Sequence, residues 1–342
     1  MKLLVTGGAG FIGSAYVRLA RRNRPEAPIV NVDALTYAGN LENLRALETD
    51  PGHLFVRGDI RDTAAMHALC RERQIDGIVN FAAESHVDRS IMAAIPFLEA
   101  NVAGTLSLLE AARKAGVRRF VQISTDEVYG SLGPRGDVDD RFDEATPLAP
   151  RNPYAASKAA ADHFVMAHHH TYGLDVAIAR CSNNYGPYQL PEKLIPLMIL
   201  NALEGRPLPL YGDGGQVRDW IFVDDCCAAI DRVLADGVAG EVYNIGADNE
   251  RTNLEVVRAI LRLCGRDESL IRLVADRPGH DRRYATDAGK IRARLGWQPQ
   301  RAFEAGLAET VRWYRANDGW AARVCSGEYR AYYERQYGTR LP

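Results

Sequence analysis

The sequence predicts an α/β fold: a doubly wound parallel sheet with helices on both faces, followed by a smaller C-terminal lobe. Three observations predict it. Apolar strand segments alternate with helical segments through residues 1–181. A glycine-rich loop joins the first strand to the first helix. From about residue 182 the alternation gives way to a region rich in proline and glycine.

Composition excludes several classes of function. The chain has 342 residues, of which 46% are hydrophobic and 25% charged, as in an ordinary globular protein. A net charge of -2 gives no reason to expect nucleic acid or an anionic membrane as a partner. The N-terminus has no signal-peptide layout, and no apolar run approaches the roughly 18 residues of a membrane span. We therefore predict a cytoplasmic protein.

Cysteine and histidine patterns predict neither disulfides nor a metal site. The six cysteines are scattered without a C-x-x-C motif, which favours thiols in a reducing compartment. Three consecutive histidines occur at 168–170, but neighbouring helical residues point about 100° apart and cannot share one ion.

The first strand, residues 2–6, leads into a loop built on Gly7, Gly10 and Gly13, and a helical pattern follows over residues 14–22. Glycine permits the tight turn and lets the backbone approach a pyrophosphate closely. The helix N-terminus then offers N–H groups and the positive end of its dipole to the anion. A strand before the loop and a helix after it predict a dinucleotide site.

Asp33 stands twenty residues after Gly13, at the end of the strand over residues 29–32. A carboxylate at this position can bond both ribose hydroxyls of NAD and would repel the 2′-phosphate of NADP. The alternative is that Asp33 only caps the next helix, which is a common function of aspartate.

Further strands continue the Rossmann-type pattern. The strand over 53–57 leads to Asp59 and Ile60, which could lie along an adenine, and the strand over 77–81 leads to the small residues Ala82 and Ala83. After a helix over 101–115, an apolar strand ends in Ser124-Thr125 and is followed by two adjacent acids, Asp126 and Glu127. Ligands of such sheets bind beyond the carboxyl ends of the strands, so the acids should lie at the ligand edge.

Tyr154 and Lys158 form a Y-x-x-x-K motif at the start of a helix that we expect to run to about residue 172. Their spacing places them one turn apart on the same face. A neighbouring lysine is expected to lower the phenol's pKa by stabilising the phenolate. A phenolate can then take the proton of a sugar hydroxyl while hydride leaves the carbon.

With the glycine loop, Ser124-Thr125 and Y-x-x-x-K in order, the sequence resembles the extended short-chain dehydrogenase/reductase family over nearly its whole length. Within that family it is most similar to dTDP-glucose 4,6-dehydratases. The segments that carry this likeness are AAESHVDRS (82–90), TDEVYG (125–130), SNNYGPYQ (182–189), PEKLIP (191–196) and VRDW (217–220).

The resemblance implies an NAD-dependent hydro-lyase and a set of site residues. Catalysis would rest on Thr125, Asp126, Glu127, Tyr154 and Lys158. NAD would contact Gly7, Gly10, Phe11, Ile12, Gly13, Asp33, Leu35, Thr36, Asp59, Ile60, Phe81, Ala82, Ala83, Tyr154, Lys158 and Asn183. The nucleotide sugar would contact Ser85, Thr125, Asp126, Glu127, Asn184, Lys193, Leu194, Pro209, Tyr211, Arg218, Asn253, Arg277 and His280.

The implied reaction explains the two adjacent acids. Elimination of water needs one carboxylate and one carboxylic acid side by side, and two close carboxyls push their pKa values apart. Residue patterns alone do not say which is which. The resemblance assigns Asp126 as the acid at the 6-hydroxyl and Glu127 as the base at C5. NAD would stay bound because it is first oxidant and then reductant.

The expected domains are an NAD-binding domain over 1–181 with segments near 226–245, and a nucleotide-sugar lobe mainly over 182–225 and 246–342. The resemblance favours a homodimer through a four-helix bundle, with an apolar stripe of Val102, Leu106 and Leu109 as one contact. That stripe could instead pack on the protein's own sheet.

Two other functions compete with dehydration of dTDP-glucose. One is a related sugar-nucleotide enzyme, either an epimerase or a 4,6-dehydratase for another nucleotide or hexose. The other is an NAD-dependent sensor or scaffold without catalysis. The adjacent acids favour dehydration over epimerisation, and the presence of Tyr154 and Lys158 disfavours a non-enzyme.

Overall fold

The computed structural model describes residues 1–133, 140–325, 331 and 333, and within them seven parallel strands form the predicted central sheet. In spatial order they are β10 (Glu241–Ile245), β6 (Val176–Cys181), β5 (Arg119–Thr125), β4 (Gly77–Asn80), β1 (Leu3–Thr6), β2 (Ile29–Asp33) and β3 (His53–Arg57). Because β1 lies between β4 and β2, the strand order reverses there and the sheet is doubly wound.

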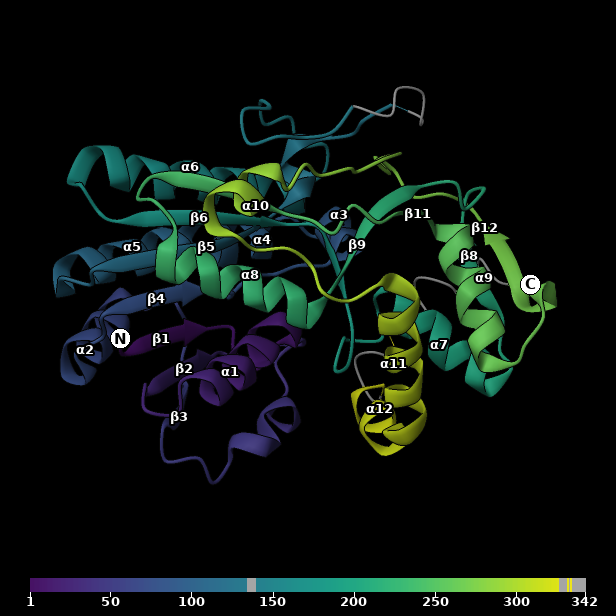
Figure 1. The fold of residues 1–342 in the computed structure, drawn as a ribbon, viewed down its shortest axis with the longest axis horizontal. Helices are drawn as coiled ribbons and strands as arrows, with labels where there is room; N and C mark the ends of the chain where they lie inside the picture. The colour runs from purple at the N-terminus through teal and green to yellow at the C-terminus, as the bar shows by residue number, and fades with distance from the viewer. Residues whose placement is uncertain (134–139, 326–330, 332, 334–342) are drawn as a thin grey trace.

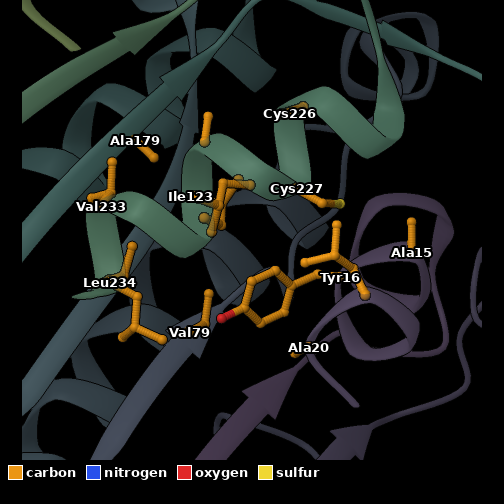
Figure 2. Packing of buried hydrophobic residues seen from close by; sticks show 14 of the residues in the cluster. Ala15, Tyr16, Ala20, Val79, Ile123, Ala179, Cys226, Cys227, Val233 and Leu234 are labelled. Atoms are coloured by element: carbon orange, nitrogen blue, oxygen red, sulfur yellow. The ribbon is translucent and has the colours of Figure 1, made fainter. Parts of the chain in front are cut away.

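Alternate side chains of the strands enter two cores, as strands buried on both faces require. Leu3 and Val5 of β1 pack under α1 (Phe11–Asn23), α8 (Val223–Asp236) and α10 (Gly289–Leu295). Leu4 faces the other core, which is covered by α2 (Thr63–Arg73), α5 (Gly104–Ala115) and α6 (Pro153–Tyr172). Figure 2 shows part of the first core, where Tyr16 of α1 lies near Cys227 of α8.

A second group of elements lies at one side of the large sheet (Figure 1). It contains β7 (Asn183–Tyr185), β9 (Val217–Phe222) and β11 (Glu250–Thr252) in one small sheet, and β8 (Leu208–Tyr211) with β12 (Ile271–Val274) in another. Its helices are α7 (Leu194–Glu204), α9 (Asn253–Cys264), α11 (Phe303–Ala316) and α12 (Asp318–Val324), which share a separate apolar core. Residues 134–139, 326–330, 332 and 334–342 of the predicted domains lie outside the described residues.

Local signals fix the helix that begins with Tyr154. The side chain of Asn152 caps α6 by accepting the backbone N–H of Ala155 at 2.9 Å, and Pro153 occupies the first turn. Gly173, with a φ of 69°, ends the helix in the left-handed conformation. The structure thus confirms the predicted helix and its end at residue 172.

Short helical segments connect the main elements. They are η1 (Leu41–Leu47), α3 (Val87–Met92), α4 (Ile95–Phe97), η2 (Leu98–Ala103), η3 (Asp126–Tyr129) and η4 (Glu268–Leu270). The helix predicted over 101–115 is α5 preceded by the π-helical η2. In the described part of the chain, every helix is too short or too polar to cross a bilayer.

Candidate active site

A cavity of 810 Å³ lies along the carboxyl ends of the sheet strands, which is the ligand edge of a parallel sheet. The predicted cofactor residues that line it are Gly7, Gly10, Phe11, Ile12, Gly13, Asp33, Thr36, Asp59, Ile60, Phe81, Ala82, Ala83, Tyr154, Lys158 and Asn183. Leu35 does not line it. Its side chain packs against the core, while its backbone N–H donates to Asp33 Oδ1 at 2.8 Å.

The glycine loop is too tightly packed for larger residues. Gly7 has a φ of +67°, and a Cβ there would lie 2.6 Å from the backbone nitrogen of Ala82. A Cβ on Gly13 would lie 2.2 Å from the carbonyl oxygen of Gly7. Among the described residues no side chain caps the N-terminus of α1 at Gly10, so backbone N–H groups there are available to an anion in the cavity.

Asp33 is held in place by two backbone N–H groups. Ala9 N donates to its Oδ2 at 2.9 Å, and Leu35 N donates to its Oδ1. Burial raises the pKa of Asp33, and both N–H donors oppose that rise. The alternative that Asp33 caps the next helix is wrong, because the side chain of Asn40 caps η1 by accepting Glu42 N.

The cavity suits a dinucleotide in size and in unmet polar groups. Its volume lies within the roughly 300–1,000 Å³ of typical ligand pockets. Three buried oxygens at its wall have no hydrogen-bond partner in the described part of the chain: Ser182 Oγ, Asn183 Oδ1 and Asn184 Oδ1. Buried polar atoms without partners are costly, so these groups indicate a polar ligand.

Tyr154 and Lys158 line the same cavity, but their electrostatics differ from the prediction. Burial raises the pKa of the Tyr154 phenol, the Glu127 carboxylate raises it further, and hydrogen bonding by Thr125 opposes the rise. Burial lowers the pKa of Lys158 to about 8. Its ammonium donates to the carbonyl of Ile123 at 2.6 Å. The expected lowering of the phenol's pKa is therefore not found, because burial and Glu127 dominate.

Asp126 is only 1% exposed and lines neither this cavity nor its neighbour. The hydroxyl of Thr125 donates to its Oδ1 at 3.4 Å, and the hydroxyl of Thr286 donates to its Oδ2 at 3.3 Å. Burial, followed by the charges of Glu127 and Asp219, raises the pKa of Asp126 to about 8. The carboxyl is therefore mostly protonated at neutral pH.

Glu127 is half-buried and lies at the wall of the cavity. Burial raises the pKa of Glu127, and the positive charges of Arg277, Arg218 and Lys193 offset that rise only in part. Its Oε2 has no hydrogen-bond partner among the described residues. The two carboxyls therefore differ in their charged neighbours: Asp126 has two carboxylates and one cation nearby, whereas Glu127 has three cations and one carboxylate.

A second cavity of 150 Å³ adjoins the first, and Glu127, Asn183, Asn184 and Lys193 line both. The predicted nucleotide-sugar residues that line it are Asn184, Lys193, Leu194, Pro209, Tyr211, Arg218, Asn253, Arg277 and His280. Ser85 lines the first cavity. The structure therefore brings residues from both halves of the chain to one continuous site.

A family model described as GDP-mannose 4,6 dehydratase matches residues 4–310. A curated dTDP-glucose 4,6-dehydratase from Xanthomonas campestris pv. campestris (strain B100) is 54% identical and covers 96% of this chain and 97% of its own. The dTDP-glucose 4,6-dehydratase from Salmonella typhimurium (strain LT2) is 50% identical, and the match covers 99% of this chain and 100% of the relative. The chain belongs to the dTDP-glucose 4,6-dehydratase family.

Solved structures place this family member among NAD-binding relatives. DesIV, a dTDP-glucose 4,6-dehydratase from Streptomyces venezuelae crystallised with NAD and TYD bound, has a TM-score of 0.91 at 54% identity and covers 95% of this chain and 100% of its own. A UDP-glucose 4-epimerase from Thermus thermophilus in complex with NAD has a TM-score of 0.84 at 32% identity. The match covers 93% of this chain and 100% of the epimerase chain. The fold is thus shared with epimerases, whereas the high identity is shared with dehydratases.

From the sequence, Asp88 is expected only to shape this dehydratase-family site through hydrogen bonds, with no partner named. Asp88 Oδ1 accepts from the guanidinium of Arg277 at 3.0 Å, and its Oδ2 accepts from the hydroxyl of Tyr211 at 3.2 Å. It therefore orients two residues of the second cavity. The signature AAESHVDRS marked the position, but a contact across 189 residues of sequence was not readable from it.

Other residues of the site were missed. Glu192 lines both cavities and accepts from Arg89 Nε at 3.1 Å; its place before Lys193 in PEKLIP was the available signal. Trp320 of α12 lines the first cavity and donates to Asn43 Oδ1 at 3.1 Å. No sequence signal indicated this contact, which joins the C-terminal helices to η1.

Proposed function

We propose that this chain converts dTDP-glucose to dTDP-4-keto-6-deoxy-glucose and water, with NAD retained and recycled in each turnover. The observation that carries the proposal is the pair Asp126-Glu127, whose carboxyls have different charged neighbours beside a dinucleotide-sized cavity. Near-full-length identity to dTDP-glucose 4,6-dehydratases supports the substrate. A DesIV structure with NAD and TYD bound supports both ligands.

The cofactor residues suit NAD rather than NADP. The backbone N–H groups at the start of α1 would bind its pyrophosphate, and Asp33 would bond the ribose hydroxyls. When bound, NAD supplies a hydride acceptor for C4 of the sugar and returns the hydride to C6. Retention of the cofactor through turnover follows from this double use.

We assign to Tyr154 the removal of the proton from the sugar's 4-hydroxyl during oxidation at C4. Thr125 lines the cavity and its hydrogen bonding favours the phenolate, so it can also orient the reacting oxygen. Lys158, one turn further along α6, contributes positive charge on the same helix face.

The elimination uses the two acids in different protonation states. Glu127, beside three cations, removes the C5 proton that the 4-ketone has acidified. Asp126, protonated at neutral pH, gives its proton to the departing 6-oxygen as the C6–O bond breaks, and water leaves. Glu127 then returns its proton to C5 as hydride reaches C6. Thr125, which contacts Asp126 and also lines the cavity, connects the buried acid to the sugar.

The nucleotide end is assigned to the second cavity. Lys193, Arg218 and Arg277 provide the positive charge that a diphosphate requires, and forked guanidinium groups suit its oxygens. Asp88 holds Arg277 in position. The product, a 4-keto-6-deoxy sugar nucleotide, would serve deoxysugar biosynthesis, and the free thiols of all six cysteines agree with a cytoplasmic setting.

A homodimer through α5 and α6 is also proposed, although the predicted stripe is not its main support. Val102 and Leu109 are buried in the chain itself, and Leu106 is half-buried. Exposed apolar side chains instead lie beside these helices, on α3, α4 and η2, and include Met92 (55%), Ile95 (63%) and Leu98 (54%). Light scattering should give twice the chain mass, and Ile95→Asp should shift it toward monomer. Leu273→Asp, at an equally exposed site on β12, is the control.

The proposed activity is tested by incubating the purified protein with dTDP-glucose and no added NAD, followed by mass spectrometry. A product lighter by one water is expected. Asp126→Asn and Glu127→Gln should lose it, whereas Asp224→Asn, at the start of α8, should retain it. Unchanged mass with altered stereochemistry would indicate an epimerase. Turnover only of UDP-, CDP- or GDP-hexoses would assign another nucleotide.

A further inference from the structure

A buried arginine lies behind the active site and does not line either cavity. Arg180, on β6, is 5% exposed. Its Nε donates to Asp162 Oδ2 at 3.0 Å, and one of its terminal nitrogens donates to the hydroxyl of Tyr129 at 2.9 Å. The guanidinium also lies 4.9 Å from the centre of the Tyr129 ring. The residue therefore joins two partners that are far apart in sequence.

Each partner belongs to an element that carries residues of the proposed mechanism. Asp162 lies on α6, one turn after Lys158, and also accepts from Ser124 Oγ at 3.0 Å at the end of β5. Tyr129 is the last residue of η3, the single turn that begins with Asp126 and Glu127. The guanidinium thus ties the turn bearing the acid pair to the helix bearing Tyr154.

Tyr129 is fixed from two further directions. Its hydroxyl donates to Asn244 Oδ1 at 2.7 Å, and its ring stacks on Phe142 with 5.1 Å between centroids. Burial raises the pKa of Tyr129 to about 12, so the hydroxyl keeps its proton and remains a donor. The contacts therefore use the hydroxyl both as an acceptor from Arg180 and as a donor to Asn244.

Such a network contributes geometry more than stability. A buried ion pair such as Asp162–Arg180 is often no more stabilising than apolar side chains of the same shape. The directional hydrogen bonds of this network nevertheless favour one arrangement of its members, although Asp162 Oδ1 has no hydrogen-bond partner among the described residues. Thr125 caps the start of η3, and Tyr129 anchors its end. The carbonyl of Val128 also accepts from Ala149 N at 3.0 Å, and its side chain is buried, so the Tyr129 hydroxyl adds a directional contact to a turn that is already packed.

We propose that Tyr129 and Arg180 are positioning residues that hold the acid pair in register with Tyr154 and Lys158. The inference rests on the proposed dehydration and assigns the two arms of the network to different steps. Oxidation at C4 depends on α6, which stays attached to Arg180 through Asp162. Elimination depends on η3, which is attached through the Tyr129 hydroxyl.

Tyr129→Phe tests this division because it removes one hydroxyl and keeps the ring stacked on Phe142. We expect kcat for dehydration to fall about tenfold, as a small misplacement of catalytic groups causes, with KM changed by less than about twofold. Because oxidation still precedes the slowed elimination, absorbance at 340 nm from bound NADH should rise in the steady state.

The matched control is Tyr243→Phe. Tyr243 is also fully buried, lies next to Asn244 on β10, and accepts the N–H of Val238 with its hydroxyl at 2.9 Å. The Tyr243→Phe variant should lower the thermal unfolding midpoint by a few degrees, about as much as Tyr129→Phe does. It should keep the kcat and KM of the wild type and show no accumulation of NADH.

Three results would overturn the inference. They are wild-type kcat in Tyr129→Phe, a loss of kcat without NADH accumulation, and equal kinetic losses in both variants. The second would locate the defect in the oxidation step, and the third would reduce the network to a structural role. A wild-type enzyme that forms no dehydrated product refutes the proposed function itself, and is recognised without any variant.

Discussion

Replacing Asp126 with asparagine should stabilise the fold while it abolishes dehydration. The carboxyl is 1% exposed, and its neighbours Glu127 and Asp219 disfavour its ionised form. An amide has nearly the same shape and stays neutral at every pH. Thr125 and Thr286, which donate to the carboxyl oxygens, can rotate their hydroxyls to suit it.

The size of the stability difference between Asp126→Asn and the wild type follows from the shift in the pKa of Asp126. Asp126 titrates at about 8 in the folded chain, against an ordinary value of 3.8. Between these values the folded state binds a proton that the unfolded state has lost, so stability falls as pH rises. The slope is about 1.4 kcal/mol per pH unit. At pH 7 the asparagine variant should therefore be more stable by up to about 4 kcal/mol.

Urea unfolding at pH 5, 6, 7 and 8, at one fixed protein concentration, measures this difference. The stability gap between Asp126→Asn and the wild type should widen steadily across the series and level off above pH 8. Asp236→Asn, an exposed position on α8, controls for the loss of a carboxylate in general. A gap that is the same at pH 5 and pH 8 would refute the raised pKa and the acid role built on it.

The same carboxyl predicts the alkaline limb of the activity profile. Because the proposed acid must be protonated, dehydration should decline as the pH passes about 8. Asp126→Asn should reduce dehydration by about a hundredfold or more, and it should still form NADH from dTDP-glucose. Full turnover by this variant would show that another group protonates the 6-oxygen.

Glu127→Gln should slow dehydration by about 10²–10⁴-fold and stop solvent deuterium from entering C5, because the base beside Arg277 is gone; mass spectrometry reads both. Asp33→Ala should lower the NAD content of the purified protein at least tenfold without a matching loss for added NADP, as measured by cofactor released on denaturation. Trp320→Phe loses the hydrogen bond to Asn43, so the free energy of unfolding measured in urea should fall by about 1 kcal/mol and NAD should be released faster. An unchanged rate of NAD release would show that α12 does not help to hold the cofactor.

Features of the fold and site that depend on local sequence were predictable. The loop needs glycine at Gly7 and Gly13 because backbone atoms of Ala82 and of Gly7, respectively, fill the space of a Cβ, and its spacing to Asp33 follows from one βαβ unit. The cap at Asn152 sets the start of α6 and hence the position of Tyr154.

Features that depend on burial and on distant contacts were not predictable. The phenol of Tyr154 has a raised pKa because tertiary packing excludes water and brings Glu127 near, which outweighs the lysine four residues away. Arg277 is oriented by Asp88 across 189 residues of sequence. The stripe at Val102 and Leu109 reads the same from sequence whether it meets a partner or is buried within the chain itself, as both residues are here.

Elimination of water requires one acid and one base, and the adjacent Asp126 and Glu127 together can provide both. Two carboxyls in one environment would compete for one proton without a fixed preference. Here β5 ends in a short helical turn, and successive residues of a turn point in different directions. One side chain enters the interior near Asp219, and the other lies at the cavity wall near Arg277 and Lys193. Because the backbone turn sets the two environments, the acid and the base are assigned before substrate binds, and any loosening of that turn should disturb elimination before oxidation.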